Sequence, residues 1–222
     1  MPLEDAIGYR FRDKALLKTA LTHPSYGKDH GTPHYQRLEF LGDAVLELAV
    51  SQMLFEARPA LQEGQMTFIR ARLVREETLS EIALEIGLDR EMRLSHGEEL
   101  SGGREKPSIL SDMAEAVIAA IYLDGGFESA AAFVRRIFCG RIAEAVKDGG
   151  LDAKSRLQIL LEKRQPGLRP MYTIVSQEGP PHDSVFTCHL FIEGVLRGEG
   201  LGKSKREAEI AAAQMTLGEM EG

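Results

Sequence analysis

The chain has 222 residues, of which 43% are hydrophobic and 27% are charged, and its formal net charge is −7. This composition is ordinary for a folded protein and excludes a disordered chain, while the length suits one large domain or one medium and one small domain. The acidic residues near the N-terminus are unlike a secretory signal, and no apolar run is expected to reach the roughly 20 residues of a membrane helix. We therefore expect a cytoplasmic protein without membrane contact, and we expect Cys139 and Cys188 to be small core residues in a reducing compartment.

Residues 1–30 predict a helix that ends before a proline. Apolar residues recur at helical spacing up to Leu21, and Thr22-His23-Pro24-Ser25-Tyr26 follows. Pro24 ends the helix whatever the function, and the pattern favours a structural hydrogen-bonding role for His23 over a ligand role.

The stretch from Gln36 to Val50 predicts a buried helix that carries two acids. Glu39 and Asp43 lie four residues apart, so their carboxylates share one side of the helix, one turn from each other. Like charges among apolar side chains are costly to ionise unless a cation or a donor compensates them. One interpretation is a metal site, and the alternative is a pair of acids in water at the edge of the apolar stripe. The stripe consists of Leu38, Leu41, Val45, Leu48 and Ala49.

The next segments predict helices joined by polar connections. Residues 62–67 predict a turn that leads into a helix. Arg70, Arg72 and Arg75 lie outside the apolar side of this helix, where they form either a solvated face or a set of phosphate contacts. Residues 78–88 predict a packing helix. Residues 95–108 predict a polar, glycine-rich loop that either touches substrate or is only a turn.

A second acidic helix is predicted over residues 111–123. It is apolar nearly all round, which is typical of a central helix, and it ends at Gly125-Gly126 before a last helix over 127–146. Asp112 and Glu115 lie three residues apart on one face of it. Together with the two acids of the earlier helix they would form an all-oxygen site, which suits Mg²⁺ or Mn²⁺ rather than zinc.

The pattern changes after residue 147. Residues 148–152 predict a polar linker, and helical spacing returns over 153–164. Strand-like alternation then begins near residues 171, 186 and 195, and residues 204–217 predict a final alanine-rich helix. This helix, three-strand meander and helix is the order of a double-stranded RNA-binding domain.

Several of these stretches resemble bacterial ribonuclease III. The run RLEFLGDAVL at 37–46 resembles that family's signature, residues 106–126 resemble its second motif, and LTHPSY at 21–26 resembles its opening motif. The resemblance implies an all-α endonuclease domain over 1–147, followed by a small α+β double-stranded RNA-binding domain over 153–222. It implies a homodimer that cleaves double-stranded RNA with Mg²⁺, for which Mn²⁺ can substitute, and without a small-molecule cofactor. The residues implied to be catalytic and to hold the metal are Glu39, Asp43, Asp112 and Glu115.

The resemblance also implies roles outside the four acids. Gln36 and Glu63 correspond to secondary active-site positions, and the family usually has glutamate where this chain has Gln36. Glutamine keeps the hydrogen-bonding reach and loses the charge. Phe40 is expected to insert into a pocket of a second subunit, and the alternative is an ordinary core phenylalanine. The expected products carry 5′-phosphate and 3′-hydroxyl ends with a short 3′ overhang, and the expected substrates are ribosomal and other structured RNA precursors.

Three segments of the C-terminal region resemble the RNA-contacting segments of such a domain. Cations crowd the start of its last helix, where the helix dipole already favours an anion, so a bound phosphate would resolve the conflict. The residues implied to bind RNA are Gln158, His182, Lys203, Lys205 and Arg206.

The negative net charge argues against a nucleic-acid partner unless the charge is unevenly distributed. Residues 151–222 carry 9 basic and 10 acidic side chains, and residues 1–150 carry 18 and 24, so the acidic excess accompanies the predicted metal site.

Two other classes of protein remain open. A non-catalytic RNA-binding protein would have no reason to retain four acids in an apolar setting. An all-helical Mg²⁺-dependent phosphohydrolase acting on nucleotides would not require residues 152–217.

Overall fold

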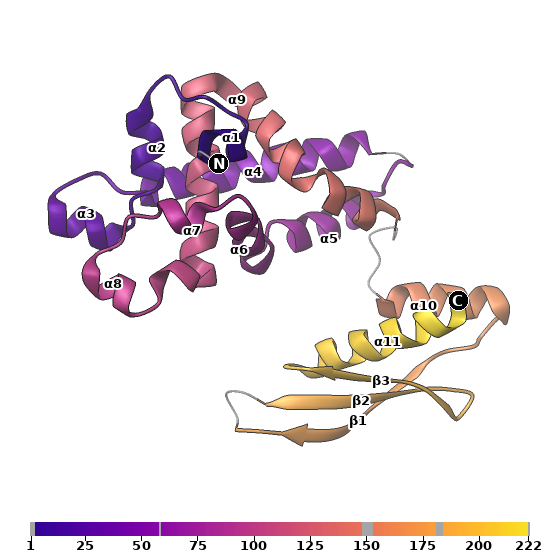
Figure 1. The fold of residues 1–222 in the computed structure, drawn as a ribbon. Helices are drawn as coiled ribbons and strands as arrows, with labels where there is room; N and C mark the ends of the chain where they lie inside the picture. Colours follow the sequence, from indigo (N-terminus) through magenta and orange to yellow (C-terminus); the bar gives the residue numbers. More distant parts are fainter. Residues whose placement is uncertain (1–2, 58, 148–152, 181–183, 222) are drawn as a thin grey trace. The chain divides into compact units, whose positions relative to one another are not determined.

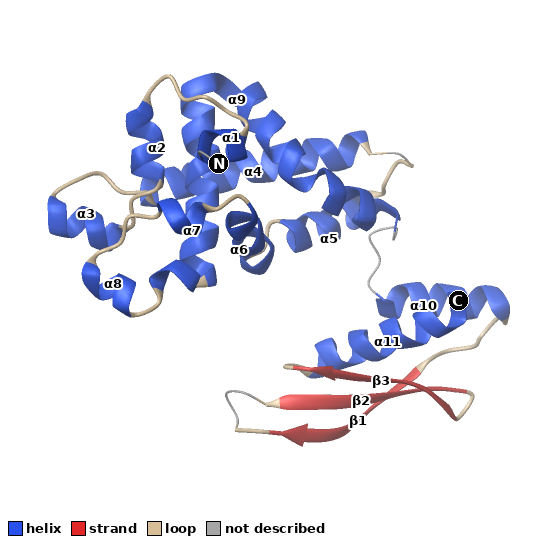
Figure 2. Cartoon of the chain, in the orientation of Figure 1, coloured by secondary structure: helices blue, strands red, loops and turns tan. Residues whose placement is uncertain are grey.

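The computed structural model describes residues 3–57, 59–147, 153–180 and 184–221, and its chain divides into two compact units, Met1–Gly150 and Leu151–Gly222. Figure 1 shows the order of the elements along the chain, and Figure 2 shows that the first unit is helical and the second combines helices with a sheet. The first unit contains α1 (Leu3–Ile7), α2 (Lys14–Ala20), α3 (Pro24–His30), α4 (Gln36–Glu56), α5 (Glu63–Leu73), α6 (Glu76–Glu85), α7 (Leu88–Glu91), α8 (His96–Leu100), the 3-10 helix η1 (Gly103–Glu105) and α9 (Pro107–Lys147). The second contains α10 (Ala153–Arg164), β1 (Met171–Glu178), β2 (Val185–Ile192), β3 (Val195–Gly202) and α11 (Lys205–Glu221).

The N-terminal unit is built around α4 and α9, which pack against each other at its centre. Their buried residues join one hydrophobic core, in which Leu46, Val50, Met113 and Ile118 are fully enclosed. The two backbones approach so closely that a Cβ atom at Gly42 would collide with the carbonyl of Glu115. Only glycine permits this contact, and the crossing therefore fixes which turn of α4 faces which turn of α9.

The predicted break at Gly125-Gly126 is a kink within α9. Gly126 has a φ of 80° and a ψ of 176°, and helical turns resume after it. Beside the kink, the Asp124 carboxylate accepts hydrogen bonds from the Tyr9 hydroxyl at 2.8 Å and from the backbone N–H groups of Arg12 and Asp13. These contacts attach the N-terminal segment to α9 and hold the pKa of Asp124 below its usual value.

Two expectations about burial were wrong. Leu48 was assigned to the buried stripe of α4, but its side chain is 57% exposed, because none of the described helices covers it. Cys139 is exposed, whereas Cys188 is buried as expected. α9 is long and apolar enough by composition to cross a membrane, contrary to the expectation, but most of its apolar residues lie in the protein core. Residues 95–108 also differ from a plain loop, since they contain α8 and η1.

The C-terminal unit is a three-stranded antiparallel sheet in the order β1-β2-β3, with α10 and α11 on one face (Figure 2). Its core consists of the inward residues of β2, chiefly Cys188 and Leu190, against Leu157 and the alanines of α11. β3 contacts α11 almost backbone to backbone, because a Cβ atom at Gly200 would collide with backbone atoms of Ala208 and Ala212. The meander predicted from the alternation is therefore present, with α11 seated directly on its edge strand.

Candidate active site and RNA-binding surface

The crossing of α4 and α9 brings the four predicted acids together. Glu39 and Asp43 flank Gly42, whose backbone lies against Glu115, and Asp112 lies one turn before Glu115 on α9. Asp43 is exposed, and the other three side chains are partly buried. The sequence pattern predicted that the two acids of each helix share one face. The contact at Gly42 brings the acidic face of α4 against that of α9.

Burial and neighbouring carboxylates raise the pKa values of two of these acids, Glu115 and Glu39. Burial, followed by the charges of Asp43, Asp112 and Glu39, raises the pKa of Glu115 to about 8. Burial and the charges of Asp112 and Asp43 likewise raise the pKa of Glu39, and burial raises that of Asp112. Ionising Glu39, Asp112 and Glu115 together is therefore unfavourable without a compensating positive charge.

The chemistry of these donors fits a divalent cation. All four are hard oxygen ligands, as Mg²⁺ and Mn²⁺ require, and the raised pKa values of Glu39, Asp112 and Glu115 show that the site would gain from positive charge. Within the described residues, no three acidic, histidine or cysteine side chains are already arranged as a closed metal cage. The crossing is thus a cluster of candidate ligands whose side chains would adjust around a bound ion.

Sequence reasoning missed Tyr35, which precedes the acidic helix. Its side chain is 2% exposed, and its hydroxyl donates to Asp112 Oδ2 at 3.4 Å. Burial and the charge of Asp112 raise the pKa of the Tyr35 hydroxyl. No local sequence signal could have revealed this contact, since Asp112 is 77 residues away in the chain.

The two predicted secondary active-site residues, Gln36 and Glu63, lie near opposite ends of α4. Gln36 is the first residue of α4, exposed and less than one turn from Glu39. Glu63 begins α5 and lines the same pocket as Phe55, which lies near the other end of α4, about 18 Å along that helix from Asp43 at 1.5 Å per residue. Within one chain, Glu63 therefore does not join the four acids.

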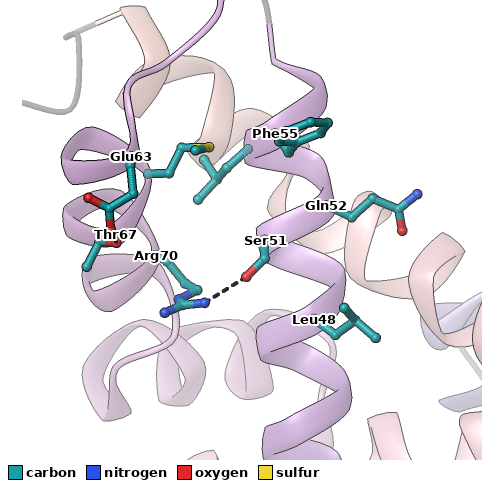
Figure 3. A pocket seen from close by; sticks show the side chains of 9 residues that line it. Leu48, Ser51, Gln52, Phe55, Glu63, Thr67 and Arg70 are labelled. Atoms are coloured by element: carbon teal, nitrogen blue, oxygen red, sulfur yellow. Dashed lines mark hydrogen bonds between the residues drawn. The ribbon is translucent and has the colours of Figure 1, made fainter.

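A largely apolar pocket of about 450 Å³ opens between α4 and α5 (Figure 3). Arg70 crosses one side of it, donating to Ser51 Oγ at 2.9 Å with Glu47 at 3.9 Å. Arg70 is thereby held in the pocket wall, while Arg72 and Arg75 are exposed. The lining residues are Leu48, Ser51, Gln52, Leu54, Phe55, Glu63, Met66, Thr67 and Arg70.

Phe40 is not a core residue. Its side chain is 83% exposed, which rules out the alternative of an ordinary buried phenylalanine. Leu48 and Phe55, at 57% and 74% exposure, follow it at helical spacing, so the three residues form an apolar stripe on the outer face of α4. We refer to Phe40, Leu48 and Phe55 as the α4 stripe. Large apolar side chains exposed on one side of a helix are typical of an interaction surface.

The start of α11 carries the predicted cations. Lys203, Lys205 and Arg206 are all exposed there. The helix start is also capped within the chain, because Glu207 accepts from the Lys203 backbone N–H at 2.8 Å, and Ser204 Oγ accepts from the Glu207 backbone N–H at 3.2 Å. This reciprocal cap supplies part of the negative charge that the helix start favours. The helix dipole therefore opposes the three cations less than the sequence suggested.

The remaining RNA-binding predictions fall on two elements. Gln158 is partly buried on α10. His182 lies outside the described residues. His23, by contrast, has the structural role that was expected, since it is the N-cap of α3 and its Nδ1 accepts from the Ser25 backbone N–H at 3.1 Å.

The fold and the site together define a two-unit protein, with an acidic helix crossing in the first unit and a small α-β-β-β-α module as the second. The family model described as Ribonuclease-III-like matches residues 13–142, and the double-stranded RNA binding motif matches residues 153–220. The chain is 45% identical over 225 residues to Ribonuclease 3 of Oleidesulfovibrio alaskensis, covering 99% of this chain and 97% of the relative. It is 46% identical to Ribonuclease 3 of Magnetococcus marinus, covering 97% and 90%.

Among solved structures, the nuclease domain of ribonuclease III from Campylobacter jejuni matches with a TM-score of 0.58 and 46% identity, covering 61% of this chain and 92% of that domain. The Campylobacter domain is described as structurally flexible in a region involved in its dimer formation. This chain belongs to the ribonuclease III family. It is an endoribonuclease with a double-stranded RNA-binding domain, and the expected class, with an all-α domain followed by an α+β domain, is confirmed.

Proposed function

We propose that this protein is a Mg²⁺-dependent endoribonuclease that cuts both strands of double-stranded RNA as a homodimer. The observation that carries the proposal is the meeting of four carboxylates at the Gly42–Glu115 contact, with the pKa of Glu115 raised to about 8. A cluster of this kind is costly to maintain in a folded protein, and pKa values so perturbed are typical of functional sites. The non-catalytic alternative gives no reason for that cost.

Glu39, Asp43, Asp112 and Glu115 would hold Mg²⁺, and Mn²⁺ would substitute for it. When bound, the ion supplies an activated water and stabilises the leaving oxygen. The exposed Asp43 side chain opens the site to the surface, whereas the partly buried Glu39, Asp112 and Glu115 form its inner wall. Gln36, at the exposed start of α4, would hydrogen-bond to substrate beside Glu39 without adding charge.

Dimerisation would join the α4 stripe of one copy to the pocket of another. The pocket is largely apolar, and Leu48 and Phe55 belong both to its lining and to the stripe (Figure 3). A two-fold interface uses the same surface on both subunits, so Phe40 of each copy can enter the pocket of the other. Since Phe40 lies between Glu39 and Asp43, this arrangement would carry Glu63 of the pocket toward the acids of the second copy.

The second unit would bind the duplex. Lys203, Lys205 and Arg206 would contact phosphates, and Gln158 and His182 would read the minor groove. The proposed boundaries are 1–147 for the catalytic and dimerisation domain, 148–152 for the linker and 153–222 for the RNA-binding domain. This module also argues against the phosphohydrolase alternative, because nucleotides would not need a double-stranded RNA binding motif.

The proposed products carry 5′-phosphate and 3′-hydroxyl ends with short 3′ overhangs. The proposed substrates are ribosomal and other structured RNA precursors in the cytoplasm, and the reaction needs neither a membrane nor a small-molecule cofactor. Two acid clusters related by a two-fold axis, each acting on one strand, would give such staggered cuts.

Incubation of the purified protein with a long RNA duplex, in Mg²⁺ and separately in EDTA, tests the proposal. Mapping of both product ends should show Mg²⁺-dependent cuts on both strands, staggered to leave 3′ overhangs. Glu115→Gln serves as the matched control, since it should bind the duplex and leave it intact. Binding by the unaltered protein without cleavage in Mg²⁺ or Mn²⁺ would instead favour the RNA-binding-only alternative.

A further inference from the structure

Tyr35 connects three segments that surround the acidic crossing. Its backbone N–H donates to the carbonyl of Thr22 at 3.0 Å, and its own carbonyl accepts from the N–H groups of Leu38 and Glu39 at 2.7 and 2.9 Å. The residue is the N-cap of α4, so its position determines where the helix that carries Glu39 begins. Its hydroxyl reaches across to Asp112 on α9.

The ring of Tyr35 has little freedom to move. It is 2% exposed, and the His23 ring packs against it edge-on, with centroids 5.6 Å apart and planes at 67°. His23 is itself held by Ser25, whose hydroxyl lies 2.8 Å from its Nδ1. A hydroxyl on so constrained a ring offers a fixed donor to the carboxylate that it faces.

On the basis of the proposed metal site, we infer that Tyr35 is a positioning residue for metal binding. It ties the Asp112 carboxylate of α9 to the start of α4, and so sets Asp112 relative to Glu39. The hydroxyl engages Asp112 Oδ2, which limits rotation of the carboxylate and leaves Oδ1 as the oxygen without a tyrosine contact. Groups that hydrogen-bond to metal ligands orient them, and their removal commonly weakens metal binding by roughly 10- to 100-fold.

The separation of 3.4 Å between the two oxygens is longer than an ordinary O–H···O hydrogen bond. Catalytic-site hydrogen bonds are often long before ligands bind and shorten in the complex. We therefore expect an effect below the usual range, a roughly three- to tenfold weakening of metal binding when the hydroxyl is removed.

Tyr35→Phe removes the hydroxyl and keeps the ring. The experiment is calorimetric titration of the full-length protein with Mn²⁺ alone, in the absence of RNA, which needs no catalytic turnover. Tyr9→Phe is the matched control, because it removes another tyrosine-to-aspartate hydrogen bond on α9, the 2.8 Å contact with Asp124, about 18 Å along the helix from Asp112. Circular dichroism checks the folding of both variants.

The expected result is a three- to tenfold higher Mn²⁺ dissociation constant for Tyr35→Phe and an unchanged constant for Tyr9→Phe. The Mg²⁺ concentration that gives half-maximal cleavage should rise in parallel, with the maximal rate largely recovered at high Mg²⁺. A constant within twofold of the unaltered protein, or an equal change in both variants, would overturn the inference. Loss of folding in Tyr35→Phe would overturn it as well, since the hydroxyl would then be required for folding.

Failure of the proposed function would look different. If the unaltered protein bound no Mn²⁺, the metal assignment itself would be wrong. If it bound Mn²⁺ with no change in Tyr35→Phe, only the role of Tyr35 would be withdrawn.

Discussion

Replacing Glu115 with glutamine should inactivate the enzyme and yet stabilise the metal-free protein. Burial and three neighbouring carboxylates raise the pKa of Glu115 from 4.5 to about 8. In the unfolded chain this group titrates near 4.5, so the folded state binds the extra proton between these two values. The stability contributed by Glu115 is therefore fully present below about pH 4.5 and is lost as the pH rises through about 8.

The size of the effect follows from the two pKa values. At about 1.4 kcal/mol per pKa unit, the raised value corresponds to roughly 3 kcal/mol of lost stability at pH 7. Glu115 is only partly buried, and solvent screening and relaxation reduce this figure to about 1–2 kcal/mol. Glutamine carries no charge at any pH, so Glu115→Gln should recover that amount, equivalent to a rise in the melting temperature of roughly 3–6 °C.

Scanning calorimetry of the full-length protein in EDTA, from pH 5 to pH 8, measures this difference. The two units can unfold separately, so the transition of the N-terminal unit is identified as the one that Mg²⁺ shifts in the unaltered protein. The variant and the unaltered protein should melt together near pH 5 and diverge toward pH 8, and added Mg²⁺ should stabilise only the unaltered protein. A variant that is less stable at every pH, or a difference independent of pH, would refute the reasoning.

Four further predictions concern other residues. Asp43→Asn should abolish cleavage while duplex affinity, measured by gel shift, stays within about twofold, and retained cleavage would contradict the mechanism. Gln36→Glu should preserve cleavage and change its Mg²⁺ optimum or substrate preference, whereas unchanged kinetics would show that the position is idle. Phe40→Ala should weaken the dimer in sedimentation at micromolar protein, because a ring that is 83% exposed in the single chain would lose its contact with the second copy. Lys205→Ala and Arg206→Ala should each lower duplex affinity and reduce the salt dependence of binding by about one phosphate contact, and an unchanged salt slope would remove them from the interface.

The local pattern of residues was informative about the secondary structure. Apolar spacing located α4 and α9, the double glycine located the kink at Gly126, and alternation located β2 from the inward residues Cys188 and Leu190. These features can be predicted from the sequence, because the periods of helices and strands place residues that are only a few positions apart on the same face. The acids of each helix could be paired for the same reason.

Burial was harder to predict where it depended on what covers a face. Leu48 and Cys139 are exposed because no other element in the described part of the chain packs over them, although their own sequence context is apolar. The same reason explains why Phe40 could not be assigned from its spacing, since a core position and an interface position have the same helical period.

The sequence by itself predicted the two-unit organisation, the three strands, the longer helices and the pairing of acids on one face of each acidic helix, because these depend on periodicity and on motifs carried by contiguous residues. Only the tertiary structure decided how the two acidic helices meet, at the contact of Gly42 with Glu115. It also decided that Tyr35 reaches Asp112, and that a pocket opens between α4 and α5. The physical reason is that close packing between segments far apart in the chain is set by the shapes of both partners, and a period read along one segment describes only one of them.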